Sequence, residues 1–210
     1  METAEIAQST LQDGKEKTLP KNSEVEIKFR VADVRRLEQS LTDAGFQLKT
    51  PPTHEVNSLY DRPGNPLRRQ GAILRLRKYG ERWRLTHKAK GTPGKYKTRE
   101  EHETAVANGP ELDAILRALG YAPVFIYEKF RSEWSDGKGE VVVDHTPIGV
   151  VAEIEGAPRW IDRTARALDV DPSDYITKSY GELFLEWKKA TGSPANNMTF
   201  RECGRRKPRF

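Results

Sequence analysis

A strict alternation of charged and apolar residues is the feature that most constrains how this chain can fold. Between Ser23 and Arg30, charged side chains fill every second position, and Val25, Ile27 and Phe29 fill the positions between them. Successive side chains of a β-strand point to opposite faces, so a period of two predicts a strand with one charged and one apolar face. The same spacing of charges returns in five later segments: Arg75 and Arg77; Lys88 and Lys90; Arg99, Glu101 and Glu103; Lys129 and Arg131; Glu153 and Glu155.

The spacing of apolar residues along the rest of the chain predicts about eight strands and four helices. The strands are expected over residues 23–30, 56–61, 72–78, 82–90, 98–106, 124–134, 140–144 and 150–156. The helices, where apolar residues recur every three or four positions, are expected over residues 33–44, 111–119, 161–168 and 179–188. Many of the strands are neighbours in the chain, which favours antiparallel pairing in an α+β fold.

The charged faces of these strands have two interpretations. In an ordinary antiparallel sheet they face solvent, and for any single pair of charges that is the simpler interpretation. Repetition in six strands favours a closed barrel whose outer face packs against helices and whose lumen holds the charges. Buried charges are costly unless they are paired or meet a counter-ion. A lumen with both signs of charge suits a metal–polyphosphate ligand, because carboxylates bind Mg²⁺ or Mn²⁺ while Arg and Lys bind phosphate oxygens.

The distribution of polar residues sets the expected limits of the folded domain. Residues 1–22 and 191–210 lack any core-forming pattern, so both segments are predicted to be disordered, with one domain over residues 23–190. The net charge of the chain is +5, but the last twenty residues alone contain five Lys and Arg against one acidic residue. Because most of the net charge lies in this tail, the charge does not predict that the folded domain binds nucleic acid.

The sequence also bears on where the protein is found. Cys203 is the only cysteine, so no disulfide can form within one chain. The N-terminal segment has no apolar run of the signal-peptide type, and no stretch approaches the ~20 apolar residues of a membrane span. A cytoplasmic protein without membrane contact is therefore expected.

A sequence motif at the first strand resembles a known family. Residues 24–28 read Glu-Val-Glu-Ile-Lys, and this ExExK pattern is the signature of the CYTH superfamily, the triphosphate tunnel metalloenzymes. The other elements of the superfamily follow in order: Arg75 and Arg77, Lys88, the R-x-E-x-E segment at 99–103, the K-x-R segment at 129–131, Asp144, and the Glu-Ile-Glu segment at 153–155. The resemblance covers residues 24–188. It implies an eight-stranded antiparallel tunnel with helices packed outside, which agrees with the strand count.

Within the superfamily, the chain is most similar to class IV adenylate cyclases of the CyaB type. The similar stretches are EVEIKFRV at 24–31, YEKFRS at 127–132, VVDHTPIG at 142–149 and AEI at 152–154. This similarity implies a metal-dependent enzyme that converts ATP to cyclic AMP and pyrophosphate, and it suggests a homodimer. Relatives on the same scaffold hydrolyse inorganic tripolyphosphate, thiamine triphosphate or RNA 5′-triphosphate, so a triphosphatase is the first alternative. A non-catalytic module that binds polyphosphate or nucleotide is the second.

The resemblance also assigns roles to individual residues. Two Mg²⁺ or Mn²⁺ ions are expected to bind Glu24, Glu26, Glu153, Glu155 and Asp144. Lys28 is expected beside the metal-bound phosphate or the attacking group, so that Glu24, Glu26 and Lys28 form the catalytic set. The triphosphate oxygens are expected to bind seven cations: Arg75, Arg77, Lys88, Arg99, Lys129, Arg131 and Lys178. For Glu101 and Glu103 two roles stay open, since they either bind metal or position the basic residues.

Overall fold

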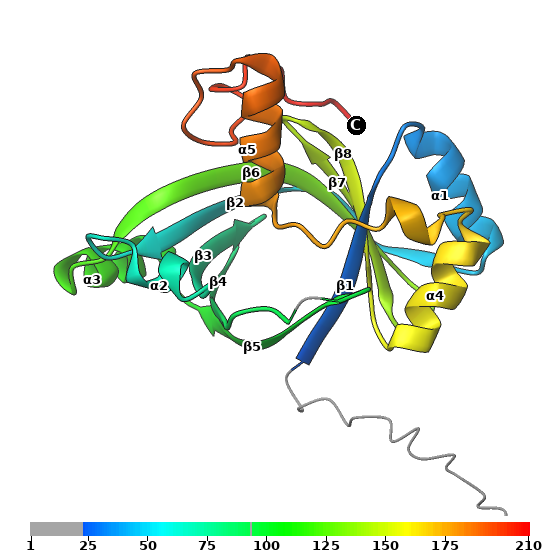
Figure 1. The fold of residues 1–210 in the computed structure, drawn as a ribbon, viewed down its shortest axis with the longest axis horizontal. Coiled ribbons are helices and arrows are strands. Elements are labelled where there is room, and N and C mark those ends of the chain that lie inside the picture. The colour runs from blue at the N-terminus through cyan, green and yellow to red at the C-terminus, as the bar shows by residue number, and fades with distance from the viewer. Residues whose placement is uncertain (1–22, 93) are drawn as a thin grey trace, which may run out of the picture.

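The structure is a computed structural model, and it describes residues 23–92 and 94–210 (Figure 1). The prediction of disorder for residues 1–22 concerns residues outside this range. The strands are β1 (Ser23–Arg30), β2 (Gln47–Asp61), β3 (Ile73–Tyr79), β4 (Arg82–Lys88), β5 (Lys97–Val106), β6 (Ala122–Ser135), β7 (Glu140–Thr146) and β8 (Gly149–Glu155). The helices are α1 (Val34–Asp43), α2 (Pro66–Arg69), α3 (Gly109–Ala118), α4 (Pro158–Ala167) and α5 (Tyr180–Thr191), with a 3₁₀ turn at Pro172–Asp174.

The eight strands close into one barrel in the order β1-β5-β4-β3-β2-β6-β7-β8. Every pair of neighbouring strands is antiparallel. The predicted α+β fold, an eight-stranded antiparallel barrel with helices outside, is thereby confirmed. The four predicted helices are present, and the short helix α2 comes in addition. Alternation explains the closure, because it gives most strands a charged face for the lumen and an apolar face for the helices.

The main hydrophobic core lies outside the barrel wall, where β1 and β8 pack against helices α1 and α4. Ile27, Leu41, Ile154 and Ile161 are completely buried in this core. Figure 1 shows α1 and α4 together on this side of the barrel. Burial of each aliphatic side chain contributes about 1.5–3 kcal/mol, so this core stabilises the strands whose opposite faces carry the ExExK and Glu-Ile-Glu segments.

Helix α5 packs against another part of the barrel, above β6 in Figure 1. Its residues Tyr180, Leu183 and Phe184 are buried in one cluster with Tyr127 of β6. The helix begins with a capping box, in which Ser179 Oγ accepts from the Glu182 N–H and the Glu182 carboxylate accepts from the Ser179 N–H. This arrangement satisfies two N–H groups at the helix start and fixes the first turn.

The disordered tail predicted for residues 191–210 is not found in the structure. The chain turns back at Gly192, and Met198 is completely buried while Phe200 is nearly so. The Met198 N–H donates to the carbonyl of Ile126, and the Met198 carbonyl accepts from the N–H of Glu128. Pairing between β6 and β7 covers only residues from Phe130 onward, so the segment around Met198 uses a free edge of β6. The folded part therefore extends beyond residue 190.

Strand β2 also begins earlier than predicted. The pattern predicted a strand over residues 56–61, whereas β2 begins at Gln47 and passes through Pro51 and Pro52. Its register with β6 shifts between Leu48 and Thr50 and again between Thr50 and Thr53. Such bulges accommodate prolines, which have no N–H to donate. The longer strand places Glu55 in the barrel wall.

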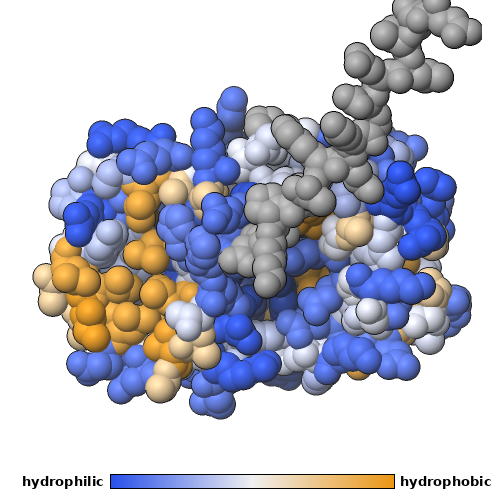
Figure 2. Space-filling view, turned by 90° about the horizontal axis from the view of Figure 1, so that it is seen from below, coloured by the Kyte–Doolittle hydropathy of each residue, from blue (hydrophilic) through white to orange (hydrophobic). Residues whose placement is uncertain are grey.

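The face of the molecule seen in Figure 2 is mainly hydrophilic outside the grey atoms. In the view from below, hydrophobic residues gather on the side that carries α3, and charged and polar residues cover most of the remaining face (Figure 2). Ile115 of α3 and Leu119, which follows this helix, are largely exposed. Among the helices of the described residues, none is both long enough and apolar enough to cross a membrane.

Candidate functional site

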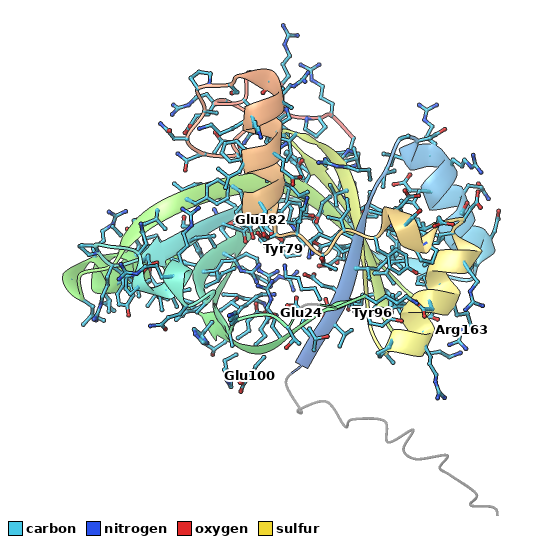
Figure 3. The ribbon with its side chains drawn as sticks, in the orientation of Figure 1. Glu24, Tyr79, Tyr96, Glu100, Arg163 and Glu182 are labelled. Atoms are coloured by element: carbon cyan, nitrogen blue, oxygen red, sulfur yellow. The ribbon has the colours of Figure 1, made fainter. Side chains whose placement is uncertain are left out.

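A cavity of about 500 Å³ inside the barrel is lined by charged side chains. Eight carboxylates and ten Lys or Arg side chains line it, and lining residues come from all eight strands and from the start of α5. Figure 3 shows Glu24 of β1 and Tyr79 of β3 on the inner side of their strands, whereas Glu100 points outward from β5. We call this space the tunnel cavity.

Four of the carboxylates lie on the neighbouring strands β1 and β8. Glu26 is directly opposite Glu155, and Lys28 is directly opposite Glu153. Opposite residues of an antiparallel pair have Cβ atoms about 4.5–5.5 Å apart on one face of the sheet. The ExExK and Glu-Ile-Glu segments therefore form one acidic wall, with the ammonium group of Lys28 within it.

Strands β3, β4 and β5 supply a mainly cationic wall. Glu103 links two of its arginines, since its carboxylate lies 3.1 Å from Arg77 Nη2 and 2.8 Å from Arg84 Nη1. Glu101 lies 2.5 Å from Lys88 Nζ in the same way. Glu101 and Glu103 both contact basic residues of this wall. This arrangement matches a role in positioning those residues, which was one of the two roles considered, rather than metal binding.

Glu24 connects the two walls. Its carboxylate lies 2.6 Å from Lys88 Nζ and 3.1 Å from Arg99 Nε. Burial alone would raise the pKa of Glu24, but the charges of Lys88 and Arg99 outweigh burial and lower the pKa to about 2. The carboxylate therefore stays ionised throughout the neutral range.

Lys28 lies between two carboxylates of the acidic wall. Its Nζ is 2.7 Å from Glu26 Oε1 and 3.2 Å from Glu153 Oε1, and the residue is only 3% exposed. Burial alone would lower the pKa of Lys28, but Glu153 and Glu26 outweigh it and raise the pKa well above its ordinary value. Lys28 is therefore a permanent cation, suited to binding phosphate oxygen rather than to accepting a proton.

Glu155 differs from the other acids of this wall because the carboxylates of Glu24 and Glu26 lie nearby. The pKa of Glu155 is raised to about 8, mainly by desolvation and next by the negative charges of Glu24 and Glu26. The residue is open to solvent on one side, which moderates this shift. Three neighbouring carboxylates stabilise a hard divalent cation by supplying oxygen ligands and by relieving their own repulsion.

The carboxylates of the acidic wall do not converge on a single metal position. In the described part of the chain, no three acidic or histidine side chains converge as metal ligands do. Glu24, Glu26 and Glu153 instead contact Lys or Arg. Their oxygen chemistry and the crowding at Glu155 fit a divalent cation, provided that lysine contacts such as Lys28–Glu26 give way to it.

The sequence of the whole barrel wall matches a known family. The model of the CYTH domain family matches residues 22–157, well over half of the chain. The protein belongs to the CYTH domain family. No curated protein matches the chain by sequence.

Solved structures with the same fold come from bacteria, archaea and plants. A Vibrio parahaemolyticus protein, provisionally described as an adenylate cyclase, is 21% identical with a TM-score of 0.68, over 77% of this chain and 97% of its own. The PH1819 protein from Pyrococcus horikoshii OT3 is 22% identical with a TM-score of 0.66, over 78% and 98%. HpAC1 from Hippeastrum is 19% identical with a TM-score of 0.58, over 78% and 95%. At these identities the similarity establishes the CYTH fold alone.

The CYTH barrel of this chain brings eleven of the thirteen predicted site residues to the tunnel cavity. The eleven are Glu24, Glu26, Lys28, Arg75, Arg77, Lys88, Arg99, Lys129, Arg131, Glu153 and Glu155. Their shared location agrees with the predicted faces of six strands, while their individual roles stay predictions.

Asp144, predicted as a metal ligand, does not lie at the cavity surface. It is completely buried behind the lining, and its Oδ2 is 2.8 Å from Lys129 Nζ, 2.6 Å from Arg131 Nη2 and 2.5 Å from the Tyr180 hydroxyl. Its Oδ1 accepts from Arg131 Nε at 2.8 Å. Because Asp144 is buried behind the lining and contacts both cations, its position suits a support for Lys129 and Arg131 better than the predicted metal ligand.

Lys178, predicted to bind the triphosphate, lies outside the tunnel cavity. Its side chain is half exposed and forms an ion pair with Glu186 of α5. Lys178 directly precedes Ser179, whose capping box begins α5. The prediction for Lys178 is not supported by this position.

Several charged residues of the CYTH barrel were not predicted as site residues, and Arg82, Glu133 and Glu140 of the cavity lining are among them. Arg84 and Lys97 line the tunnel cavity, and Glu55 is completely buried beside Lys129 and Arg77. Strand alternation would have found Arg84 and Lys97, because Arg84 shares a face with Lys88 and Lys97 shares one with Arg99. Glu55 preceded the predicted start of its strand by one residue.

Proposed function

We propose that the protein is a divalent-metal-dependent enzyme that acts on a triphosphate, converting ATP to cyclic AMP and pyrophosphate as a class IV adenylate cyclase does. The observation that supports this proposal is the pairing of an acidic wall on β1 and β8 with cationic side chains from β3 to β6 around one cavity inside the barrel. Such a lumen matches the two halves of a metal–triphosphate complex. The similarity of residues 24–31 and 127–132 to CyaB-type cyclases favours the cyclase among CYTH activities.

The cationic side chains would bind and orient the phosphate chain. Arg75, Arg77 and Lys88 approach the cavity from β3 and β4, and Lys129 and Arg131 approach it from β6. Arginine binds phosphate oxygens through two parallel N–H groups, which fixes both position and orientation. Asp144 and Glu103 hold several of these cations from behind, so the phosphate-binding geometry is preorganised.

Mg²⁺ or Mn²⁺ fits the acidic wall. The residues that would hold it are Glu24, Glu26, Glu153 and Glu155, whereas Asp144 is buried behind the cavity lining. When bound, the cation neutralises charge on the phosphate oxygens and on the leaving group. Lys28, held between Glu26 and Glu153, adds a permanent positive charge to the same place.

The cyclase reaction needs the α-phosphorus to face an internal nucleophile. The ribose 3′-hydroxyl attacks the α-phosphorus and loses its proton to water, the bond from this phosphorus to the bridging oxygen breaks, and pyrophosphate leaves with the electron pair. Most of the catalytic effect of a phosphoryl-transfer site comes from positioning and charge stabilisation. Arg99 and Lys28 are placed to supply charge next to the acidic wall.

A triphosphatase is the second candidate, and a relative with the same fold favours it. HpAC1 from Hippeastrum, which is described as an adenylyl cyclase, reveals a dominant triphosphatase activity. Hydrolysis uses the same phosphate clamp but presents the terminal phosphorus to a water molecule. The arrangement of the two walls therefore suits either reaction, and the products distinguish them.

Product analysis separates the candidates. The protein is incubated with Mg²⁺ or Mn²⁺ and ATP, tripolyphosphate or thiamine triphosphate, and the products are separated by chromatography. Cyclic AMP with an equal amount of pyrophosphate supports the cyclase, and orthophosphate alone refutes it in favour of the triphosphatase. Binding without any turnover of the three substrates would identify a non-catalytic module.

Two matched variants test the acidic wall. Glu26→Gln removes a carboxylate from the cavity, and we expect turnover to fall by at least about 100-fold. Glu100→Gln makes the same change on the outer face of β5, where the side chain is 54% exposed, and should leave turnover unchanged. Equal activity of the two variants would exclude the proposed metal role of Glu26.

A further inference from the structure

The last ten residues, from Arg201 to Phe210, lie on the outer surface of the barrel, and we call them the arm. In Figure 1 the arm continues from the loop after α5 towards β7 and β8. All ten residues are described by the structure, and none of them lines the tunnel cavity. The CYTH match ends at residue 157, so the arm also lies outside the matched range. A role of the arm would therefore be separate from the proposed activity.

Two contacts hold the arm against the barrel wall. Lys207 Nζ lies 3.4 Å from a carboxylate oxygen of Glu128 on β6. The ring centroid of Phe210 lies 5.4 Å from that of Phe130 on β6 and 4.9 Å from that of His145 on β7. The arm therefore follows a fixed path over the barrel. A surface that is already ordered loses less conformational entropy when it binds a ligand than a free tail would.

The cations of the arm have few acidic partners. Arg205, Arg206 and Arg209 are exposed, and among the described residues the one ion pair of the arm is that of Lys207. Glu202, the acidic residue of the arm, instead accepts from two backbone N–H groups of the preceding loop. Three consecutive residues span at most about 7 Å, which is less than the Debye length of about 8 Å at physiological ionic strength. These positive charges therefore repel one another, and a bound polyanion would relieve the repulsion.

Phe210 places an aromatic ring beside these cations. It is 63% exposed, and among the described residues of the arm it is the one large hydrophobic side chain that is exposed. Single-stranded nucleic acid suits this combination, because its phosphates pair with arginine and its bases stack on aromatic rings. A membrane surface suits it less well, since peripheral binding of that kind uses an amphipathic helix with a broad apolar face, and the described residues of the arm form no helix.

We propose that the arm binds single-stranded nucleic acid, with phosphates on Arg205, Arg206 and Arg209 and a base stacked on Phe210. Charge and stacking carry little sequence information, so binding should depend only weakly on base sequence. The nucleic acid then lies on the outside of the barrel and leaves the tunnel cavity free. This inference goes beyond the proposed function and does not depend on it.

The test is a titration of a short single-stranded RNA with the full chain, followed by fluorescence anisotropy at several salt concentrations. The probe has a 5′-hydroxyl end and a 3′ label, so it offers no triphosphate to the tunnel cavity. We expect a Kd of roughly 1–100 µM near physiological salt. If about four cations of the arm contact phosphates, the logarithm of the binding constant should fall against that of the salt concentration with a slope of about −3.

Two variants of the arm separate charge from stacking. Replacing Arg205, Arg206 and Arg209 together by Ala should weaken binding at least about 30-fold near physiological salt and reduce the slope by about 2. Phe210→Ala should weaken binding about 10-fold and leave the slope unchanged, because it removes a stacking surface and no charge.

A matched control removes the same amount of charge from another face of the protein. It replaces three exposed arginines of α4 by Ala: Arg159, Arg163 and Arg166. Figure 3 shows Arg163 on the outer side of α4, away from the interior of the barrel. The control should bind the RNA within about 2-fold of the wild type, since it keeps the arm intact.

Three results would overturn the inference. An equal loss of affinity in the arginine variant and in the control would show that only net charge matters. No measurable binding of the wild type at low salt would exclude nucleic acid as the ligand. Binding to phosphatidylserine vesicles without binding to RNA would assign the arm to a membrane surface.

Two further measurements keep the test independent of folding and of the proposed activity. Thermal unfolding of each variant identifies any loss of fold, and Phe210→Ala remains informative if the arginine variant is unstable. Triphosphate turnover by both arm variants should equal that of the wild type, because the substituted residues lie outside the tunnel cavity. A failed RNA titration would therefore leave the proposed function standing.

Discussion

At the scale of single residues, Glu55 holds together cations from two strands of the barrel. Its completely buried carboxylate lies 3.5 Å from Lys129 Nζ and 3.8 Å from Arg77 Nη1, and Asn57 donates to it at 2.8 Å. Burial alone would raise the pKa of Glu55, but the charges of Lys129, Arg131 and Arg77 outweigh it and lower the pKa to about 2. Removal of this charge would leave buried cations without their partner.

We therefore expect Glu55→Gln to lower the free energy of unfolding by about 3 kcal/mol at neutral pH. Because the folded pKa lies below the ordinary value of 4.5, the stabilisation by the ionised carboxylate is complete above that value and is lost as the pH falls towards 2. Urea denaturation at neutral pH and near pH 3 should show the difference between wild type and variant shrinking in acid. A difference that does not change with pH would contradict this role, and the exposed Glu100→Gln variant provides the reference.

Asp144, which was predicted as a metal ligand, is a second buried carboxylate that contacts cations of the barrel. Asp144→Asn keeps the shape of the side chain but removes the charge that holds Lys129 and Arg131. We expect the KM for the triphosphate to rise about 10-fold, while the metal concentration for half-maximal activity stays unchanged. Glu26→Gln should shift that metal concentration. A comparable shift in Asp144→Asn would restore Asp144 as a metal ligand.

At the scale of elements, the C-terminal segment completes the packing between β6 and α5. Met198, Phe200 and Ala195 are buried, and Met198 pairs with the backbone of β6. A stop codon after Gly192 should therefore destabilise the protein by several kcal/mol, because loss of a single large buried side chain costs about 2–5 kcal/mol. The measurement is thermal unfolding, with a stop after Arg205 as the control that keeps these residues. Equal melting temperatures of the two truncated proteins would show that the segment is dispensable.

Helices and strands in which apolar residues recur at a regular spacing were predicted from the sequence. Segments whose conformation depends on contacts with distant parts of the chain were not. The alternation of β1 and the helical spacing in α1 gave their limits within a residue or two. The start of β2 was missed because Pro51 and Pro52 interrupt the pattern, and bulges in the pairing with β6 accommodate them. The buried residues around Met198 have no period at all, since the free edge of β6 determines their position.

The same distinction applies to the site. The inward faces of the strands follow from alternation, so the sequence identified most of the charged lining, and it would have identified Lys97 as well. Whether a carboxylate faces a metal or an ammonium group depends on strand register and depth. Asp144 lies opposite Arg131 in the pairing of β7 with β6, and no pattern within either strand shows this. The cavity of about 640 Å³ between α5 and strands β2, β3 and β6 was also beyond prediction, because these elements are distant in the chain.

At the scale of the whole molecule, the tunnel cavity is close to electrical balance. Its lining carries ten cationic and eight acidic side chains, and the carboxylates of Glu55 and Asp144 lie directly behind it. A triphosphate alone would bring more negative charge than this lining can compensate. Divalent cations restore the balance, so ligand and metal are expected to bind together.

The last prediction follows from this balance and concerns the stability of the whole protein. Ligand present at about 100 times its dissociation constant stabilises the folded state by about 2.7 kcal/mol. For a chain of this size that corresponds to a rise in melting temperature of roughly 5–10 °C. We expect ATP with Mg²⁺ to produce such a rise, and ATP with a chelator, or Mg²⁺ alone, to produce much less. Glu26→Gln should lose the part of the rise that depends on metal, whereas Glu100→Gln should keep it. An equal rise in melting temperature with ATP and the chelator would show that the cationic wall binds the triphosphate without a metal ion. In that case the carboxylates of the acidic wall would stabilise the barrel and would not take part in ligand binding.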